Sequence, residues 1–201
     1  IVGSTDNSNF QITQGFSQPR IVIKTYVPDD NFEAYLETHD ASGNVVSVGD
    51  ANSMGDGIAN NDSVITANIS GITSLDVNNQ NISDLTGVEA FTALTNLYCD
   101  ENQLTSLNLI QNIALTILSC PYNQLTSLDV TQNIALTDLS CGYNSLTSLD
   151  LSQNNFLETL VCGNNQLTNL DLSNKNSLGF VYCVYNQLIS LDVSGCNFLY
   201  Y

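Results

Sequence analysis

The stretch Leu115-Thr-Ile-Leu118-Ser-Cys120-Pro-Tyr-Asn123-Gln-Leu125-Thr-Ser-Leu128-Asp-Val130 decides the fold, because its pattern returns 21 residues later. The next copy reads Leu136-Thr-Asp-Leu139-Ser-Cys141-Gly-Tyr-Asn144-Ser-Leu146-Thr-Ser-Leu149-Asp-Leu151. Further copies place the leading leucine at Leu94, Leu115, Leu136, Leu157, Leu178 and Leu199. A fixed period of this length is typical of a solenoid, in which each turn of the chain buries its apolar side against the next.

Each turn contains two halves with the same apolar spacing. In the first half, Leu118 and Cys120 alternate with outward residues, as on a short strand with one buried face. Asn123 ends this strand, and its inward amide is expected to satisfy backbone groups that water cannot reach. The second half, residues 125–130, repeats the L-x-x-L-x-L spacing. The sequence therefore predicts a β-rich solenoid of leucine-rich repeats, with two short parallel strands per turn.

The chain before the repeats predicts a small α-containing cap. Residues 1–20 are rich in Ser, Asn and Gln and predict a flexible leader. Residues 21–27 have strand composition, a helix is expected to open at residues 28–30, and residues 45–48 are read as one arm of a hairpin. The predicted helix has Phe32, Tyr35 and Leu36 on one apolar face. We therefore divide the chain into a leader (1–20), a capping segment (21–71) and a solenoid (72–201) whose last repeat is incomplete.

Two places depart from the regular repeat. Residues 83–93 have apolar side chains every three residues, which predicts a helical or 3₁₀ segment instead of a second strand. The sequence given stops at Leu199-Tyr200-Tyr201, one triplet into a new turn. Solenoids need polar caps at their ends. We therefore expect either that the native chain continues, or that this uncapped end associates end to end with another copy.

Composition excludes several functions. The formal charge is −17, with 3 Lys and Arg against 20 Asp and Glu, so the surface repels nucleic-acid phosphates and anionic lipid. No run of 18 apolar residues appears, so membrane insertion is not expected. The sequence contains one histidine, His39, and no nucleophile elbow, phosphate loop or zinc signature. It therefore predicts that the protein is not an enzyme.

Two columns of equivalent residues have both a chemical and a structural interpretation. The cysteine column is expected to consist of buried free thiols, because side chains in register on parallel strands point the same way and suit disulfides poorly. Its members are Cys99, Cys120, Cys141, Cys162 and Cys183. Cys196 lies outside it and is expected to be the most exposed thiol.

The second column is interpreted as a solvated face with local hydrogen bonds, or as a weak divalent-cation site. It comprises Asn108, Asp129, Asp150, Asp171 and Asp192.

A separate candidate for calcium is the Gly/Asn/Asp-rich loop 49–62. Its oxygen-bearing side chains at Asp50, Asn52, Asp56 and Asp62 are of the type that calcium binds. Met54 stands where an oxygen ligand is expected, so the alternative is a plain capping loop. The sequence predicts no other cofactor.

The outward residues beside the cysteine strand vary from turn to turn, while the buried frame does not. Variation on a constant frame is typical of a recognition surface, and tyrosine suits interfaces because its ring is apolar and its hydroxyl is polar. The candidate ligand-binding residues are Tyr98, Tyr122, Asp138, Tyr143, Phe180, Tyr182 and Tyr185. The alternative is that the tyrosines at 122, 143 and 185 only stack on one another as packing.

The two-strand unit of 21 residues, with cysteine at the third core position, resembles the IRREKO class of bacterial leucine-rich repeats found in surface proteins of marine Bacteroidetes. This resemblance covers the chain from Ile72 onward. The combination of residues 27–32 with 84–89 resembles the start of internalin-like proteins, in which a small segment caps the first repeat. The resemblances imply a secreted or cell-surface module that binds a protein, or less readily a glycan, in adhesion. The alternative is a passive spacer within a larger surface protein.

Overall fold

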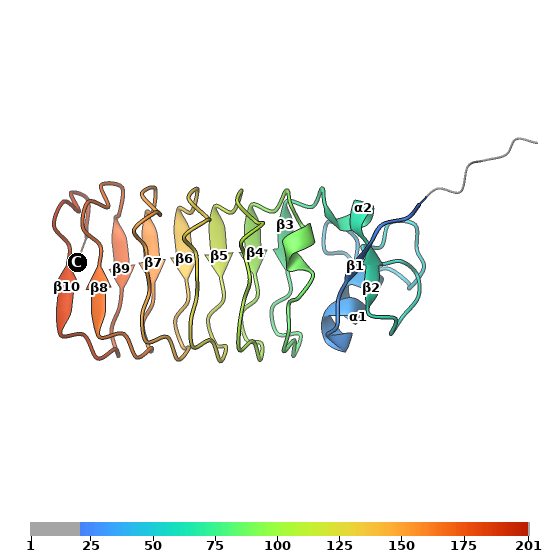
Figure 1. Cartoon of the computed structure of the whole chain (residues 1–201), viewed down its shortest axis with the longest axis horizontal. Coiled ribbons are helices and arrows are strands. Elements are labelled where there is room, and N and C mark those ends of the chain that lie inside the picture. Colours follow the sequence, from blue (N-terminus) through green and yellow to red (C-terminus); the bar gives the residue numbers. More distant parts are fainter. Residues whose placement is uncertain (1–20, 201) are drawn as a thin grey trace, which may run out of the picture.

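The computed structural model describes residues 21–200 and forms a parallel β-solenoid with an N-terminal cap (Figure 1). The predicted leader, residues 1–20, lies outside the described residues. The main sheet has six parallel strands, each in register with its neighbour one turn away. They are β3 (Ser74–Asp76), β4 (Asn96–Tyr98), β5 (Ile117–Ser119), β6 (Asp138–Ser140), β7 (Thr159–Val161) and β9 (Phe180–Tyr182). The predicted leucine-rich-repeat solenoid is therefore confirmed.

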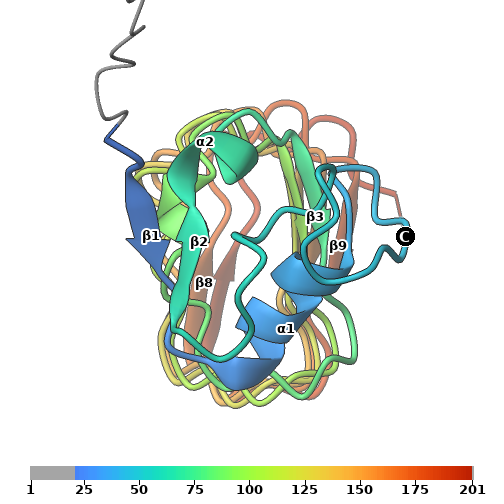
Figure 2. The same ribbon diagram turned by 90° about the vertical axis from the view of Figure 1, so that its right-hand side faces the viewer.

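Within the described residues, the second half of the repeat forms a strand in only two of the repeats. There, β8 (Asn169–Asp171) and β10 (Ser190–Asp192) pair in parallel on the side of the solenoid away from β9 (Figure 2). The equivalent segments of earlier turns are not strands, although their apolar side chains, such as Leu128 and Val130, are buried. The L-x-x-L-x-L spacing predicts which side chains are buried, and an irregular segment can bury them as well as a strand does. The spacing therefore does not distinguish a hydrogen-bonded strand from an irregular segment.

Inward asparagine side chains join successive turns at the end of the main sheet. The Asn123 amide donates to the carbonyl oxygens of Cys99 (2.9 Å) and Cys120 (3.1 Å), and its Oδ1 accepts from the Leu104 N–H (3.0 Å). Equivalent bonds recur at Asn102, Asn144, Asn165 and Asn186. The expected role of this asparagine is confirmed: it bridges buried backbone groups of adjacent turns.

A second asparagine column lies at the opposite corner of the turn. Its members, Asn112, Asn133 and Asn154, are buried and donate to carbonyls of the preceding turn. Cys196 continues this column, with its Sγ 3.1 Å from the Leu172 carbonyl oxygen. Cys196 and Cys183 are both partly buried, so Cys196 is one of the two most exposed thiols, and the expectation that it is the most exposed stays a prediction. The four other cysteines are buried, and all six are free.

The cap closes the first turn of the solenoid. Strand β1 (Lys24–Tyr26) pairs antiparallel with β2 (Ser63–Ile65), and helix α1 (Asp30–Thr38) lies across the end of the stack (Figure 2). Phe32 and Leu36 of α1 are fully buried, as the sequence predicted. Residues 45–48 are not a strand: Val45 forms only an isolated bridge with His39 and is 78% exposed. Residues 45–48 have no buried face, so no apolar packing holds them as a hairpin arm.

Two short helical elements complete the described chain. Helix α2 (Thr66–Ile69) follows β2, and the 3₁₀ helix η1 (Val88–Ala90) replaces the second strand of the first turn. The predicted helical segment within residues 83–93 is confirmed at η1. Within residues 21–200, no helix has both the length and the apolar character required to cross a bilayer.

Candidate ligand-binding surface

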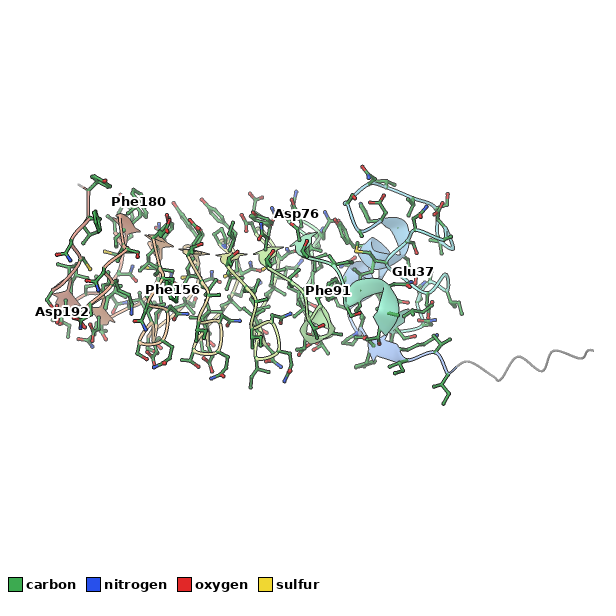
Figure 3. All side chains as sticks on the ribbon, turned by 90° about the horizontal axis from the view of Figure 1, so that it is seen from above. Glu37, Asp76, Phe91, Phe156, Phe180 and Asp192 are labelled. Atoms are coloured by element: carbon green, nitrogen blue, oxygen red, sulfur yellow. The ribbon has the colours of Figure 1, made fainter. Side chains whose placement is uncertain are left out.

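The exposed side of the six-stranded sheet, together with the column of residues three positions beyond each strand, is here named the strand face. Figure 3 shows Asp76 and Phe180 along this long side of the solenoid and Asp192 along the opposite side. All the candidate binding residues are on the strand face. Tyr98, Asp138, Phe180 and Tyr182 are in strands, whereas Tyr122, Tyr143 and Tyr185 follow strand ends.

The three residues that follow strand ends form, with Glu101 and Asn164, one column that we name the tyrosine column. The rings of Tyr122 and Tyr143 stack with their centroids 4.1 Å apart and their planes 13° apart. Tyr185 is 75% exposed: Asn164 rather than a ring occupies the turn before it, and no described turn follows it. Stacking between neighbouring rings is therefore seen only for Tyr122 and Tyr143 in the described residues.

Every member of the tyrosine column has a left-handed backbone conformation. Their φ angles lie between 52° and 56°. The left-handed conformation destabilises a residue that has a side chain by roughly 1–2 kcal/mol relative to the right-handed one, and glycine and asparagine tolerate it best. Sequence reasoning missed this feature. Asparagine at the equivalent positions 79 and 164 was the available signal, since both residues also have positive φ.

Gly163 opens space for the Tyr182 ring. A Cβ atom added at Gly163 would lie 2.6 Å from a ring carbon of Tyr182, a distance that real Cβ atoms essentially never show. The ring therefore lies directly against the backbone of the preceding turn. Phe180 is 49% exposed and Tyr182 37% exposed, because β9 is the last strand of the main sheet and no described turn covers it.

The strand face is acidic, and the two Lys residues of the described range lie elsewhere. Lys24 Nζ pairs with Asp56 Oδ2 at 2.6 Å in the cap. Lys175 continues the buried asparagine column on the far corner, where Asp150 and Asp171 line the same shallow cleft. Burial lowers the pKa of Lys175, and these two carboxylates partly oppose that shift. Neither lysine therefore neutralises the carboxylates beside the tyrosine column.

The structure does not bring the predicted calcium ligands into one site. Asp50 Oδ1 accepts from the backbone and side-chain nitrogens of Asn52 (2.8 and 3.0 Å), whereas Asp56 is engaged by Lys24. In the described part of the chain, the acidic group compact enough for one ion is Asp30, Glu33 and Asp62, which includes only one predicted ligand. Calcium binding by the loop stays a prediction, which the effect of millimolar calcium on the melting temperature would test.

Two buried carboxylates of α1 hold this loop, and sequence reasoning missed them. Glu37 accepts from the N–H groups of Asp56 and Gly57, and Glu33 accepts from those of Asn61 (3.0 Å) and Asp62 (3.2 Å). Glu33 is 1% exposed and Glu37 is fully buried. Their spacing of one helical turn on the face toward the loop was the available signal.

The acidic column on the far side forms local hydrogen bonds. The aspartates accept from the backbone N–H two residues later, as Asp129 does from Thr131 (2.9 Å) and Asp171 from Ser173 (2.8 Å). Hydrogen bonds from the Thr131 hydroxyl and N–H lower the pKa of Asp129, and the bond from the Ser173 N–H lowers that of Asp171. The geometry matches the local-hydrogen-bond interpretation of this column, while divalent-cation binding there stays a prediction.

This architecture, a parallel solenoid of leucine-rich repeats closed by a small cap, is the fold of the internalin leucine-rich-repeat domains. No family model matches the chain. Over 51 residues, 25% of this chain and 6% of the relative, it is 44% identical to internalin J of Listeria monocytogenes serotype 4b (strain F2365). Internalin-like leucine-rich-repeat proteins of Listeria are therefore its relatives.

Two solved structures extend the comparison. The functional domain of InlJ from Listeria monocytogenes, described as including a cysteine ladder, aligns with a TM-score of 0.65 and 32% identity over 89% of this chain and 42% of that chain. The internalin InlF from L. monocytogenes strain 4b F2365 aligns with a TM-score of 0.68 and 21% identity over 84% of this chain and 46% of that chain, which supports the fold alone. The chain thus spans less than half the length of each relative.

Proposed function

We propose that this chain is a non-catalytic leucine-rich-repeat module, secreted or displayed at the cell surface, that binds a protein ligand through the strand face in adhesion. We also infer that its 21-residue unit is of the IRREKO type. The observation that carries the binding proposal is the placement of Tyr122, Tyr143 and Tyr185 at exposed positions with left-handed backbone. Strain of this kind persists where the surrounding structure enforces it, and it concentrates at functional sites.

Asn164 shows that this column does not require a tyrosine. Asparagine occupies the same backbone conformation at lower cost, and one turn of the column already uses it. The rings of Tyr122 and Tyr143, which lie in inner turns of the solenoid, are still 50% and 45% exposed, so burial recovers only part of that cost. These rings are therefore better explained by contact with a ligand, since tyrosine is a frequent binding hot spot.

The relatives support this class of function. Internalin-like leucine-rich-repeat proteins are binding proteins rather than enzymes, and a solenoid face with partly exposed aromatic rings is suited to binding an extended surface. A passive spacer is the second candidate, because the stacked Tyr122–Tyr143 pair contributes packing whether or not a ligand binds.

A displayed peptide library tests the proposal, because selection from it does not require the ligand to be identified first. Selection would use the wild type, with the variant Tyr143→Asn/Tyr185→Asn as the subtractive bait. Asparagine is chosen because Asn164 shows that this conformation accepts it. The proposal expects peptides that bind the wild type at least about tenfold more tightly than the double variant, since each lost hot spot is worth about 1–2 kcal/mol or more.

The matched control is Asn108→Ala/Gln153→Ala, which removes two exposed polar side chains from other faces. Selected peptides should bind this control as they bind the wild type. If no peptide distinguishes the wild type from the tyrosine variant, the strand face is not the binding surface and the spacer interpretation is favoured.

A further inference from the structure

The end of the strand face nearest the cap combines carboxylates with aromatic rings. We name this set the acidic–aromatic cluster: Asp76, Tyr98, Asp100, Glu101 and Tyr122. Asp76 and Tyr98 are register partners on β3 and β4, and Asp100 follows Tyr98 by two residues on the same side of the chain. Glu101 and Tyr122 are successive members of the tyrosine column, one turn of about 4.8 Å apart.

The carboxylates of this cluster have no cationic partner among the described residues, although Asp76 Oδ1 accepts from the Asn78 N–H (3.1 Å). Asp100 Oδ1 is buried and has no hydrogen-bond partner. Burial raises the pKa of the Asp100 carboxyl group; a hydrogen bond with Ser119 opposes this shift, and the nearby carboxylates of Asp76 and Glu101 add to it. Neither Lys24 nor Lys175 is near them, because the first is paired in the cap and the second lies at the far corner. Three mutually repelling carboxylates in this setting favour an incoming cation.

The Tyr122 ring supplies a surface for that cation. Tyr143 stacks on one side of the ring, so its other side faces the turn that holds Glu101. Glu101 is close enough to contribute to the raised pKa of Tyr122, after the larger effect of hydrogen bonding to Tyr143. A planar cation between the Tyr122 ring and the Glu101 carboxylate would gain both a cation–π contact and a charge-assisted hydrogen bond.

We propose that the acidic–aromatic cluster binds an arginine side chain of a basic protein partner, with the guanidinium stacked on Tyr122 and paired with Glu101. This proposal rests on the proposed function and specifies its ligand chemistry. The net charge of −17 supports a basic partner, because complementary charge steers association and suppresses acidic competitors. Arginine suits the site better than lysine, since its planar group stacks on aromatic faces and meets carboxylates with two donors.

Two other occupants fit less well. A single metal ion needs its ligand oxygens close together, and in residues 21–200 the acidic group within 4.8 Å is Asp30, Glu33 and Asp62, which is outside this cluster. A neutral sugar could stack on Tyr122, but it would leave the carboxylates of Asp76, Asp100 and Glu101 without a counter-charge.

The experiment uses peptides of alternating glycine and arginine, glycine and lysine, or glycine and glutamate, titrated into the isotopically labelled protein and followed by NMR. The arginine peptide should bind most tightly, the lysine peptide several-fold more weakly, and the glutamate peptide not at all. The largest shifts should fall on the amides of Glu101 and Tyr122. Rising salt should weaken the arginine complex, because exposed charges are screened.

Variants locate the site. Glu101→Gln combined with Tyr122→Asn should weaken arginine-peptide binding at least about tenfold, which corresponds to about 1.4 kcal/mol. Asp150→Asn removes one charge from the far side and is the matched control, with an expected change of less than about twofold. A dispersed NMR spectrum verifies that each variant is folded.

Several results would overturn the proposal. Equal binding of the arginine and lysine peptides, with equal loss in Asp150→Asn, would show only diffuse attraction by net charge. Shifts at Glu101 and Tyr122 with maltohexaose but not with the arginine peptide would assign the cluster to a glycan. Displacement of the arginine peptide by millimolar calcium, with shifts at Asp76, Asp100 and Glu101, would assign it to a metal ion. If the library selection succeeds but its peptides lack arginine, this proposal fails while the proposed function stands.

Discussion

The Asp29 carboxylate accepts hydrogen bonds from both the N–H and the hydroxyl of Ser83, each at 2.8 Å, across 54 residues of sequence. The oxygen that accepts both, Oδ2, also accepts from the Asp84 N–H (3.1 Å). The other oxygen caps helix α1 by accepting from the N–H groups of Asn31 and Phe32, both at 3.0 Å. One side chain thus begins the capping helix and fastens it to the first turn of the solenoid.

Stability in acid should depend on Asp29. Burial alone would raise the pKa of Asp29, but hydrogen bonds from Ser83, Phe32 and Asp84 outweigh it and leave the pKa below its ordinary value. A carboxyl group with a lowered folded pKa contributes stability above its unfolded pKa of about 3.9, and this contribution is lost as pH falls through the folded value. We expect Asp29→Asn to lower the free energy of unfolding at pH 7 by about 1–3 kcal/mol.

The measurement is urea unfolding of the wild type and Asp29→Asn at pH 7 and near pH 3. The difference between them should shrink at the lower pH, because the wild-type carboxylate is then partly protonated. Asp192→Asn, at an exposed carboxylate, is the control and should change the free energy of unfolding little at either pH. A difference that is the same at both pH values would contradict this account of Asp29.

The asparagine that ends each strand should be far more important for stability than its exposed neighbour. Asn123→Ala leaves the carbonyls of Cys99 and Cys120 and the N–H of Leu104 without this partner. Each buried unpaired group costs about 1–3 kcal/mol, so we expect a loss of about 2–4 kcal/mol after partial relaxation. Chemical denaturation measures it, with the exposed Gln124→Ala as control and an expected change within about 0.5 kcal/mol. Equal effects would refute the bridging role.

Thiol labelling should follow burial. Burial raises the pKa of Cys162 to about 12 and raises that of Cys120 strongly, so both are thiols rather than reactive thiolates at pH 8. Cys183 and Cys196 are partly exposed and should react first, although slowly, because burial raises their pKa values as well. Iodoacetamide labelling followed by peptide mass spectrometry tests this order. Rapid native labelling of Cys120, or a disulfide between turns, would show that it is wrong.

Backbone strain in the tyrosine column predicts an unusual gain in stability. Tyr185→Gly should raise the free energy of unfolding by about 0.5–1 kcal/mol, because glycine adopts φ near +54° without penalty and the lost ring is 75% exposed. Phe180→Gly, an exposed aromatic within β9, is the control and should lower stability because glycine weakens a strand. Guanidinium unfolding compares the two. A loss of stability in Tyr185→Gly would mean that its ring packs more than its exposure indicates.

The repeat made much of the fold predictable from sequence. A period of 21 residues with buried leucines determines the stacking, and the same spacing places Tyr122, Tyr143 and Tyr185 in one column. The stacking of the first two rings, and the isolation of Tyr185 behind Asn164, follow from that column and the order of residues in it.

What the sequence did not show depends on backbone conformation and distant contacts. The left-handed backbone of the tyrosine column is imposed by the tight corner after each strand, and tyrosine gives no local indication of it. The loop 49–62 resembled a calcium loop because its oxygen-rich residues were visible in sequence. Its hydrogen-bond acceptors, Glu33 and Glu37, lie 19 to 29 residues earlier on α1, and apart from their spacing of one helical turn nothing in the sequence links them to this loop.

The most direct test of the central claim, that the tyrosine column binds a ligand, measures binding and stability on the same variant. Tyr143→Asn/Tyr185→Asn would be compared with the wild type for affinity to the selected peptides, by calorimetric titration, and for Tm. We predict at least a tenfold loss of affinity, about 1.4 kcal/mol, because contact with the ligand is lost, with Tm little changed, because relief of backbone strain at both positions offsets the lost Tyr122–Tyr143 stacking. Unchanged affinity with a lowered Tm would contradict the claim and identify the tyrosines as packing in a passive spacer.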